Sequence, residues 1–573
     1  MVRNLCFGAT LFCLALLLAG PSVAKDGSLS PRSGSSKTQA VDRLFAQWTK
    51  PDTAGAVVAI VQDGKIIYSR GYGMANLEYD EPNTPATVFH LASVSKQFTA
   101  FAIYLLAQDG KLSLDDDVRK YLPQLHDFGK TVTLRELLHH TSGVRDQWNL
   151  LALGGWRLDD EITDADVSRL LFRQTELNFP PGDQFLYSNS GYTLLAMVVQ
   201  RVSGMPLPEF AQKRIFQPLG MTHTHFQANY RLVVKNRAYS YAPGDDGRYK
   251  YIALSYSTVG PSSLFSTVGD LARWDENFYS GQVGGRALLS DMQIKGKLNN
   301  GKEIPYASGL IIEKYRGLNT VSHSGGDAGY RTNILRFPDQ HFSVIVLANA
   351  GDMDPPDLSL RIADIYLKDR LDPAPAKLAP SKKPQIEIDP KLLEPYLGDY
   401  EIGPGVIFTF TRENGQLVSQ VTGQSKVPLL AASNTRFHPV TIDADIEFDG
   451  PVVSGKVQSG VIHQGGQSVR FKRIDIPLLT PAQLKPFEGK FYSDELGVIY
   501  EIKEKDGVLT VGYPRGEMAL QPSGKAMFAA DFPIGLLKFN CDEGGGCNAF
   551  TLDSGRVQKL RFVKVAITPI AAK

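Results

Sequence analysis

The chain has 573 residues, of which 43% are hydrophobic and 21% charged, a balance typical of globular proteins with ample core material. Because one hydrophobic core stops growing at about 250–300 residues, this length predicts several domains. The formal net charge of +1 and the pI of about 7.6 give no basis for a nucleic-acid partner.

Residues 1–24 have the pattern of a secretory signal peptide, with Arg3 before an apolar run and Ser22-Val23-Ala24 as a cleavage site. A retained membrane anchor is the weaker alternative, because the run is short and ends at Gly20-Pro21. We therefore expect an exported protein, periplasmic or secreted, without an integral membrane anchor in its mature form. Residues 25–40 are rich in Ser, Gly, Lys and Pro and are expected to be disordered.

Residues 41–370 are expected to form the first domain. Two β-rich runs, at residues 55–61 and 65–70, meet at Asp63-Gly64, which is a strong hairpin signal. Helical and irregular sequence dominates residues 89–277. Strand character then returns in three segments, at residues 309–314, 333–336 and 342–348. Strands at both ends predict an α/β (α+β) domain, with helices flanking an antiparallel sheet and a separate helical region.

An internal repeat follows a proline-rich linker at residues 371–390. The stretch from Leu393 to Tyr400 matches that from Leu484 to Phe491. Apolar positions recur at an offset of about 91 residues, pairing Leu417, Leu429, Phe437 and Phe448 with Leu509, Leu520, Phe528 and Phe539. The repeat predicts two small antiparallel, lipocalin-like β-barrels, at residues 391–478 and 479–573.

The stretch of residues 90–107 is apolar nearly all round, which predicts a helix buried in the domain core and ended by Asp109-Gly110. Ser93 and Lys96 lie one turn apart at its start. A serine hydroxyl becomes nucleophilic when a base takes its proton, and a lysine in an apolar site loses its own proton readily. S-x-x-K is a weak motif alone, and a second copy from Ser22 to Lys25 lies in the leader.

Two further motifs follow in order along the chain. Tyr187-Ser188-Asn189 is its only Y-x-N, and His323-Ser324-Gly325 is its only H-[S/T]-G. Together with S-x-x-K they resemble the serine β-lactamase and penicillin-binding enzymes. The tyrosine of the second motif resembles the branch with class C β-lactamases, DD-carboxypeptidases, D-aminopeptidases and esterases. The paired trailing barrels are similar to the D-aminopeptidases in particular.

The resemblance implies a role for each motif residue. Ser93 would be the acylated nucleophile, and its N–H would form the oxyanion hole with that of Gly326. Lys96 and Tyr187 would share the general-base and general-acid work, with the adjacent ammonium lowering the pKa of the phenol. Which of the two is the acylation base stays open. Asn189 would bridge Lys96 and the substrate amide.

His323 would lie beside the substrate, where the β-lactamase pattern has a lysine. A neutral imidazole attracts a carboxylate less than an ammonium does, so the resemblance favours a peptidase, amidase or esterase over an efficient β-lactamase. The expected function is an exported serine hydrolase acting on a small molecule or peptide, with peptidoglycan fragments among the possible substrates. The alternatives are a slowly deacylating penicillin-binding or sensor protein, a class C-like β-lactamase, and a binding module built on the barrels.

The remaining candidates concern disulfides and metals. Cys541 and Cys547 are the only cysteines beyond the leader, and outside the cytosol they are expected to form a disulfide across a loop. His139-His140 looks like a metal-binding pair but is expected to be structural, because adjacent helical residues point apart. No cofactor and no metal are expected.

Overall fold

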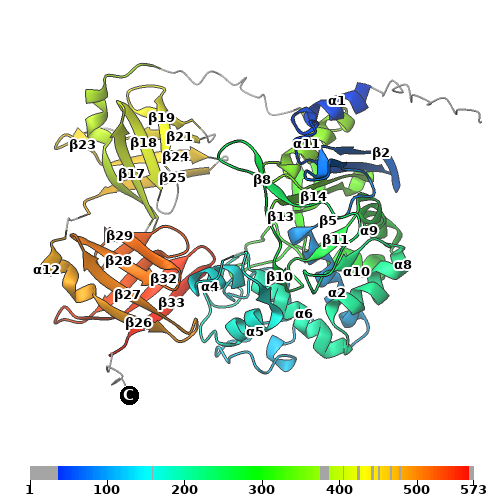
Figure 1. Ribbon diagram of the computed structural model, residues 1–573, viewed down its shortest axis with the longest axis horizontal. Helices are drawn as coiled ribbons and strands as arrows, with labels where there is room; N and C mark the ends of the chain where they lie inside the picture. Colours follow the sequence, from blue (N-terminus) through cyan, green and yellow to red (C-terminus); the bar gives the residue numbers. More distant parts are fainter. Residues whose placement is uncertain are drawn as a thin grey trace, which may run out of the picture.

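The computed structural model describes residues 36–157, 159–373, 386–403, 406–421, 426–440, 444–449, 452–464, 467–476 and 479–566. A domain of sheet and helices lies beside two barrels (Figure 1). The predicted signal peptide, residues 1–24, lies outside the described residues, as do residues 25–35 and 374–385.

A six-stranded antiparallel sheet, in the order β12-β13-β14-β15-β1-β2, forms the first layer. Its strands are β1 (Ala56–Gln62), β2 (Lys65–Tyr72), β12 (Ile311–Tyr315), β13 (Leu318–Asp327), β14 (Tyr330–Phe337) and β15 (Phe342–Ala348). β1 pairs with β2 through the predicted hairpin, in which Asp63 and Gly64 both have positive φ. β1 also pairs with β15, so the first and last strands of the domain meet at the centre of the sheet.

Helices cover both faces of this sheet. On one face lie α1 (Ser36–Leu44) and α11 (Pro355–Tyr366), which pack around Val58, Ile60 and Val346. On the other lies α9 (Val268–Ser280), against β1 and β15. The prediction that residues 25–40 are disordered is wrong for the last five of them, since α1 begins at Ser36. Packing of α1 on α11 overrides the polar local composition there.

A helical region adjoins the sheet and contains the predicted buried helix, α2 (Lys96–Gln108). All of α2 from Lys96 to Leu106 is buried, and the chain leaves it at Gly110 with φ of 69°. The other helices are α3 (Leu134–Leu138), α4 (Gln147–Leu153), α5 (Asp164–Phe172), α6 (Asn189–Ser203), α7 (Leu207–Ala211), α8 (Gln217–Leu219) and α10 (Gly285–Asp291). Short strands link them: β3 (Met74–Asn76), β4 (Glu81–Pro82), β5 (Phe89–His90), β6 (Ile162–Thr163), β7 (His225–Phe226), β8 (Tyr241–Pro243), β9 (Tyr249–Tyr251), β10 (Tyr256–Ser257) and β11 (Leu264–Ser266).

Two closed antiparallel barrels complete the chain. The first consists of β16 (Gly398–Gly403), β17 (Val406–Glu413), β18 (Gln416–Val421), β19 (Val427–Ala431), β20 (Arg436–Pro439), β21 (Ala444–Phe448), β24 (Ser459–Gln464) and β25 (Gln467–Ile474), with β22 (Val452–Val453) and β23 (Lys456–Val457) as a side ribbon. The second consists of β26 (Gly489–Ser493), β27 (Val498–Lys505), β28 (Val508–Tyr513), β29 (Gly516–Gly524), β30 (Met527–Ala530), β31 (Gly535–Cys541), β32 (Cys547–Ser554) and β33 (Val557–Lys564). The eight repeated apolar positions are buried in the two barrel interiors. The predicted fold class is thus confirmed.

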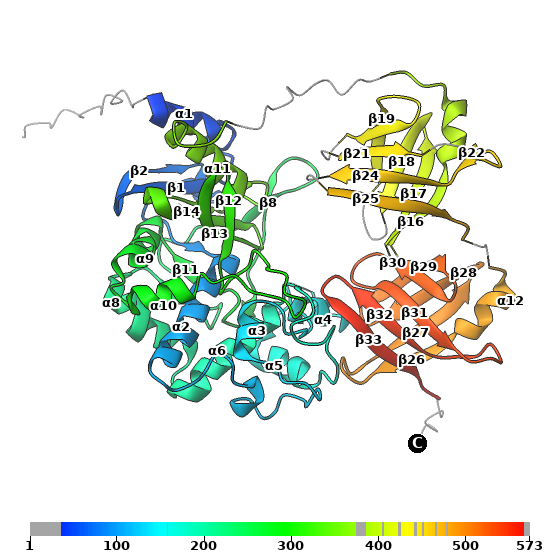
Figure 2. The ribbon, with the colours of Figure 1, turned by 180° about the vertical axis from the view of Figure 1, so that it is seen from behind.

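The second barrel is docked on the helical region. Figure 2 shows α4 beside β32 and β33, and apolar contacts make the interior of this barrel continuous with the helical core. The first barrel has a core of its own. Arg145, just before α4, is fully buried and donates to the carboxylate of Glu495 at 2.6 Å. Tyr500 donates its hydroxyl to the carbonyl of Leu153 at 2.7 Å.

Among the described residues, no helix has the length and apolar character needed to span a membrane.

Candidate active site

Ser93 lies in a 3₁₀ turn, Ala92–Ser95, that leads directly into α2. Ala92 holds a left-handed conformation with φ of 49°, which is strained for a residue with a side chain. The Ser95 hydroxyl fixes this bend by donating to the carbonyl of Ala92 at 2.5 Å. The turn presents Ser93 at the N-terminal end of a buried helix, where free N–H groups and the positive end of the helix dipole gather.

Lys96 contacts Ser93 from one turn along. Its Nζ lies 3.1 Å from the Ser93 Oγ, 3.0 Å from the Asn189 Oδ1 and 2.9 Å from the Pro261 carbonyl. The residue is 0% exposed, and burial lowers its pKa well below the ordinary value, against an opposing effect of Asp146. A neutral amine has two N–H donors, and Asn189 and Pro261 supply two acceptors. Its lone pair is then left to face the Ser93 hydroxyl.

Asn189, the first residue of α6, is held by a carboxylate that the sequence did not reveal. Asp146 accepts from the Asn189 backbone N–H at 2.7 Å and from its side-chain Nδ2 at 2.8 Å. This pairing directs the amide oxygen of Asn189 toward Lys96. Through its other oxygen, Asp146 caps α4 by accepting from the N–H groups of Trp148 and Asn149. One buried aspartate therefore joins the start of α4 to the lysine of α2.

Tyr187 covers Lys96 from the pocket side. Its ring centre lies 4.8 Å from the Nζ of Lys96, and its hydroxyl forms a side-chain hydrogen bond with Ser93. The predicted lowering of its pKa by the ammonium is wrong in this structure. Burial raises the pKa of Tyr187 above its ordinary value, which outweighs the lowering by Ser93 and by Arg556. Tyr187 is therefore a phenol, able to donate a proton, beside an amine able to accept one.

The end of β13 runs past the nucleophile with one edge open. β12 pairs with β13 only as far as Ser322, so the segment from His323 to Asp327 extends beyond its neighbour. A two-residue turn joins β13 to β14, with Asp327 paired to Tyr330. Along an antiparallel pair, successive residues direct their backbone N–H groups alternately toward the partner strand and away from it. The N–H of Gly326, next to Asp327, therefore points away from β14 and toward the open edge. A side chain on Gly325 would clash with the Leu91 carbonyl and Thr332. The glycine allows the strand to approach the Ser93 turn.

His323 lies within this strand but does not line the cavity at Ser93. It is 3% exposed, donates from Nδ1 to the carbonyl of Ser324 at 2.6 Å, and accepts at Nε2 from the Tyr306 hydroxyl at 2.9 Å. Burial and the neighbouring Lys96 lower its pKa to about 3, so the imidazole is neutral. The third motif thus supplies no positive charge for a substrate.

His140 has a different environment from the adjacent His139. His140 accepts from the Ser188 N–H at 3.1 Å and has its ring centre 4.2 Å from that of Tyr187. The Ser308 hydroxyl lies 3.5 Å from the Nε2 of His139. The two side chains diverge, but the predicted helical reason is wrong, because α3 ends at Leu138 and His140 has a left-handed φ of 59°. His140 supports the loop that carries Tyr187. No cluster of metal-ligating side chains occurs among the described residues.

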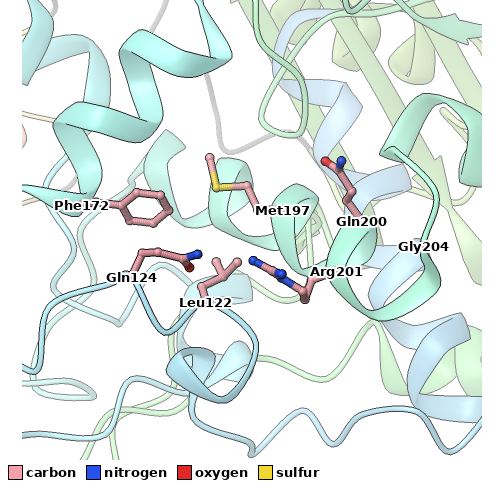
Figure 3. A pocket seen from close by; sticks show the side chains of 7 residues that line it. All are labelled: Leu122, Gln124, Phe172, Met197, Gln200, Arg201 and Gly204. Atoms are coloured by element: carbon pink, nitrogen blue, oxygen red, sulfur yellow. The ribbon is translucent and has the colours of Figure 1, made fainter.

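The cavity at the nucleophile has a volume of about 850 Å³. Its walls include Ser93, Tyr187, Asn189 and Gly326, so the structure brings four of the predicted site residues to one pocket. Arg556 of the second barrel also lines it. A separate hollow of about 510 Å³ (Figure 3) shares none of these residues and is lined by Leu122, Gln124, Phe172, Met197, Gln200, Arg201 and Gly204.

Cys541 and Cys547 lie far along the chain from this pocket and pair with each other at the tip of the β31–β32 hairpin, with their sulfurs 2.06 Å apart. Neither residue lines the Ser93 cavity.

A family model described as beta-lactamase matches residues 41–367. The chain belongs to the beta-lactamase family. It is 30% identical over 431 residues to "Penicillin-binding protein 4*" of Bacillus subtilis, a match that covers 72% of this chain and 94% of the relative. It is 28% identical over 310 residues to a D-aminopeptidase of Gluconobacter oxydans, covering 54% of this chain and 58% of the relative.

Solved structures agree with this assignment at the level of the fold. The octameric penicillin-binding protein homologue from Pyrococcus abyssi aligns with a TM-score of 0.55 at 22% identity, over 84% of this chain and 99% of its own. The family predicted from three short motifs is therefore confirmed, and with it the class of the enzyme, a serine hydrolase of the beta-lactamase family.

Proposed function

We propose that this protein is an exported hydrolase that forms an acyl-enzyme on Ser93 and cleaves amide or ester bonds, with D-amino-acid peptides and amides as its favoured substrates. The observation that carries the proposal is the contact of 3.1 Å between the buried Lys96 Nζ and the Ser93 hydroxyl, with Asn189 and Pro261 supplying two further acceptors to that nitrogen at 3.0 and 2.9 Å.

Acylation follows from this arrangement. The Ser93 oxygen attacks the substrate carbonyl while its proton passes to the lone pair of Lys96. The carbonyl oxygen becomes an oxyanion and accepts from the N–H groups of Ser93 and Gly326. Collapse of the intermediate breaks the scissile bond, and the leaving group takes a proton from Tyr187, which Lys96 can replace.

Deacylation repeats these steps with water in place of the serine hydroxyl. A water molecule gives a proton to the basic pair, its oxygen bonds to the acyl carbon, and Ser93 leaves with a proton. In this scheme Lys96 is the first acceptor in acylation, because burial lowers its pKa and raises that of Tyr187. Asn189 and Asp146 serve to hold the lysine in place.

The proposed substrate class is supported by the relatives, among which a D-aminopeptidase aligns over 310 residues, 54% of this chain. A second function is favoured by the match to a penicillin-binding protein over 94% of that relative's length. In that case Ser93 would acylate and then deacylate slowly. Both functions share the nucleophile and differ only in the fate of the acyl-enzyme.

Intact-mass spectrometry during turnover separates the two. The protein is mixed with D-aminoacyl anilides, D-alanyl-D-alanine peptides, cephalosporins and short-chain esters, and product release is followed with the mass of the protein. A hydrolase shows repeated turnover of at least one D-amino-acid substrate with little accumulated adduct. A stable adduct on Ser93 with no further product would reject hydrolysis, and absence of any adduct or product would reject acyl transfer itself.

A further inference from the structure

The hairpin between β32 and β33 brings a residue of the second barrel into the Ser93 pocket. Its tip is Gly555-Arg556, and a side chain on Gly555 would clash with Asn149 of α4. The backbone carbonyl of Arg556 accepts from the Asn178 side chain at 2.9 Å, and Asn178 in turn accepts from the Gln558 N–H at 2.7 Å. The backbone of the tip is thus fixed on both sides of Arg556.

The guanidinium of Arg556 lies among the motif residues. Its carbon is 4.9 Å from the ring centre of Tyr187, and Nη1 is 3.6 Å from the Asp146 Oδ2. The side chain remains 43% exposed and lines the cavity together with Ser93 and Asn189. A cation stacked on an aromatic ring is held in orientation without using up its N–H donors.

Asp146 pairs only weakly with the guanidinium of Arg556. Asp146 Oδ2 already accepts two hydrogen bonds from Asn189, both shorter than 2.9 Å, whereas the ion pair with Arg556 is long. Within the described residues this is the one ion pair of Arg556. A guanidinium carries five N–H donors in a planar fork that matches a carboxylate. Several of these donors are therefore left to the cavity.

The other charged groups of the cavity have contacts of their own. Arg331 donates to the carbonyls of Ala328 and Tyr330 at 3.0 and 2.8 Å. Asp327 accepts from Ser262 and Tyr256, and the remaining acid in the lining is Asp159. Arg331 lies opposite Gly326 on β14, whereas Arg556 is the cation that stacks on Tyr187 and pairs with Asp146.

We propose that Arg556, supplied by the C-terminal barrel, binds a free carboxylate of the substrate close to the scissile bond. The inference rests on the proposed acyl transfer at Ser93 and names its substrate class: acyl compounds with a carboxylate positioned over Tyr187, such as peptides with a free C-terminus next to the cleaved bond. The second barrel is then a part of the binding site and not only an appended module.

Matched substrates test this. N-acetyl-D-alanyl-D-alanine with a free carboxylate is compared with its C-terminal amide, in the full-length protein and in Arg556→Gln. Loss of a charge-assisted pair predicts a fall of about 10- to 100-fold in kcat/KM for the carboxylate. At a pH above the acid limb of both proteins, the amide should change less than about threefold, since it forms no such pair. Arg515→Gln is the control, because Arg515 is 44% exposed, belongs to the same barrel and pairs with Asp160 across the same interface. It should leave the ratio of the two substrates unchanged.

Binding provides a readout without turnover. In Ser93→Ala protein, calorimetry with N-acetyl-D-alanine should show tighter binding than with its amide, and adding Arg556→Gln should remove the difference. Labelling of Ser93 by a fluorophosphonate reports on the nucleophile alone and should survive in Arg556→Gln. Equal effects of Arg556→Gln on carboxylate and amide, in turnover or in binding, would overturn the assignment. Failure of the wild type to label would instead overturn the proposed function.

Discussion

The buried pair of Arg145 and Glu495 should govern how firmly the second barrel is docked. The side chains are 0% and 5% exposed, and their atoms are 2.6 Å apart. Burial lowers the pKa of Arg145 and raises that of Glu495, so desolvation opposes both charges. Removing either charge therefore leaves the other buried without its partner, which lowers the stability of the fold. Glu495→Ala leaves a buried guanidinium with Glu176, which is half exposed and 3.9 Å away, as its remaining ion-pair partner, a change that costs about 3–5 kcal/mol.

The matched control is the exposed pair of Arg515 and Asp160 at the same interface, for which Arg515→Gln should cost about 1 kcal/mol or less. Urea denaturation followed by intrinsic fluorescence measures the first unfolding transition, because a multidomain chain need not unfold in one step. Limited proteolysis then shows whether the second barrel is released. If Glu495→Ala moves this transition no further than Arg515→Gln does, the pair does not anchor the barrel and the reasoning is refuted.

Three further outcomes follow from the site. Asn189→Ala removes a hydrogen-bond acceptor of Lys96 and should slow labelling of Ser93 about 100-fold or more. Far-UV circular dichroism is the folding control, and an unchanged labelling rate would contradict the role of Asn189. Activity should be lost as pH falls through the pKa of Lys96, because an ammonium has no lone pair, and burial places this limb of the kcat/KM profile well below the ordinary lysine value. Since the charge of Arg556 also lowers that pKa, Arg556→Gln should move the limb to higher pH. A limb near about 10.4 in the wild type would show that burial does not lower the pKa of the catalytic lysine. His323→Lys buries an ammonium in place of a neutral imidazole and should destabilise the first domain by several kcal/mol. The unfolding midpoint measures this loss, and His323→Gln is the milder control.

Much of this architecture was predictable because it depends on local pattern. The apolar stretch around α2 predicts burial, and the burial of Lys96 follows from its place on that helix. The barrel repeat was visible because each copy must fill a similar interior, so Phe437 and Phe528 occupy equivalent core positions. Three short motifs in the right order were enough to indicate the family.

What the sequence did not show depends on contacts between distant segments. Asp146 and Arg556 meet at the site although no local pattern marks either residue, and their side chains lie 3.6 Å apart only after the second barrel has docked. The proline-rich linker suggested independent domains, whereas Arg145 and Glu495 join them. The pKa of Tyr187 was predicted from one neighbouring charge, but the burial that raises it comes from the whole fold.

The most direct test of the account is covalent labelling at Ser93. Wild-type protein and Ser93→Ala are incubated with a fluorophosphonate and with a penicillin, and the modified peptide is identified by mass spectrometry. The account predicts one adduct on Ser93 in the wild type and, in a variant with an unchanged circular dichroism spectrum, no adduct and no turnover. An adduct on another serine, or turnover that survives Ser93→Ala, would contradict it.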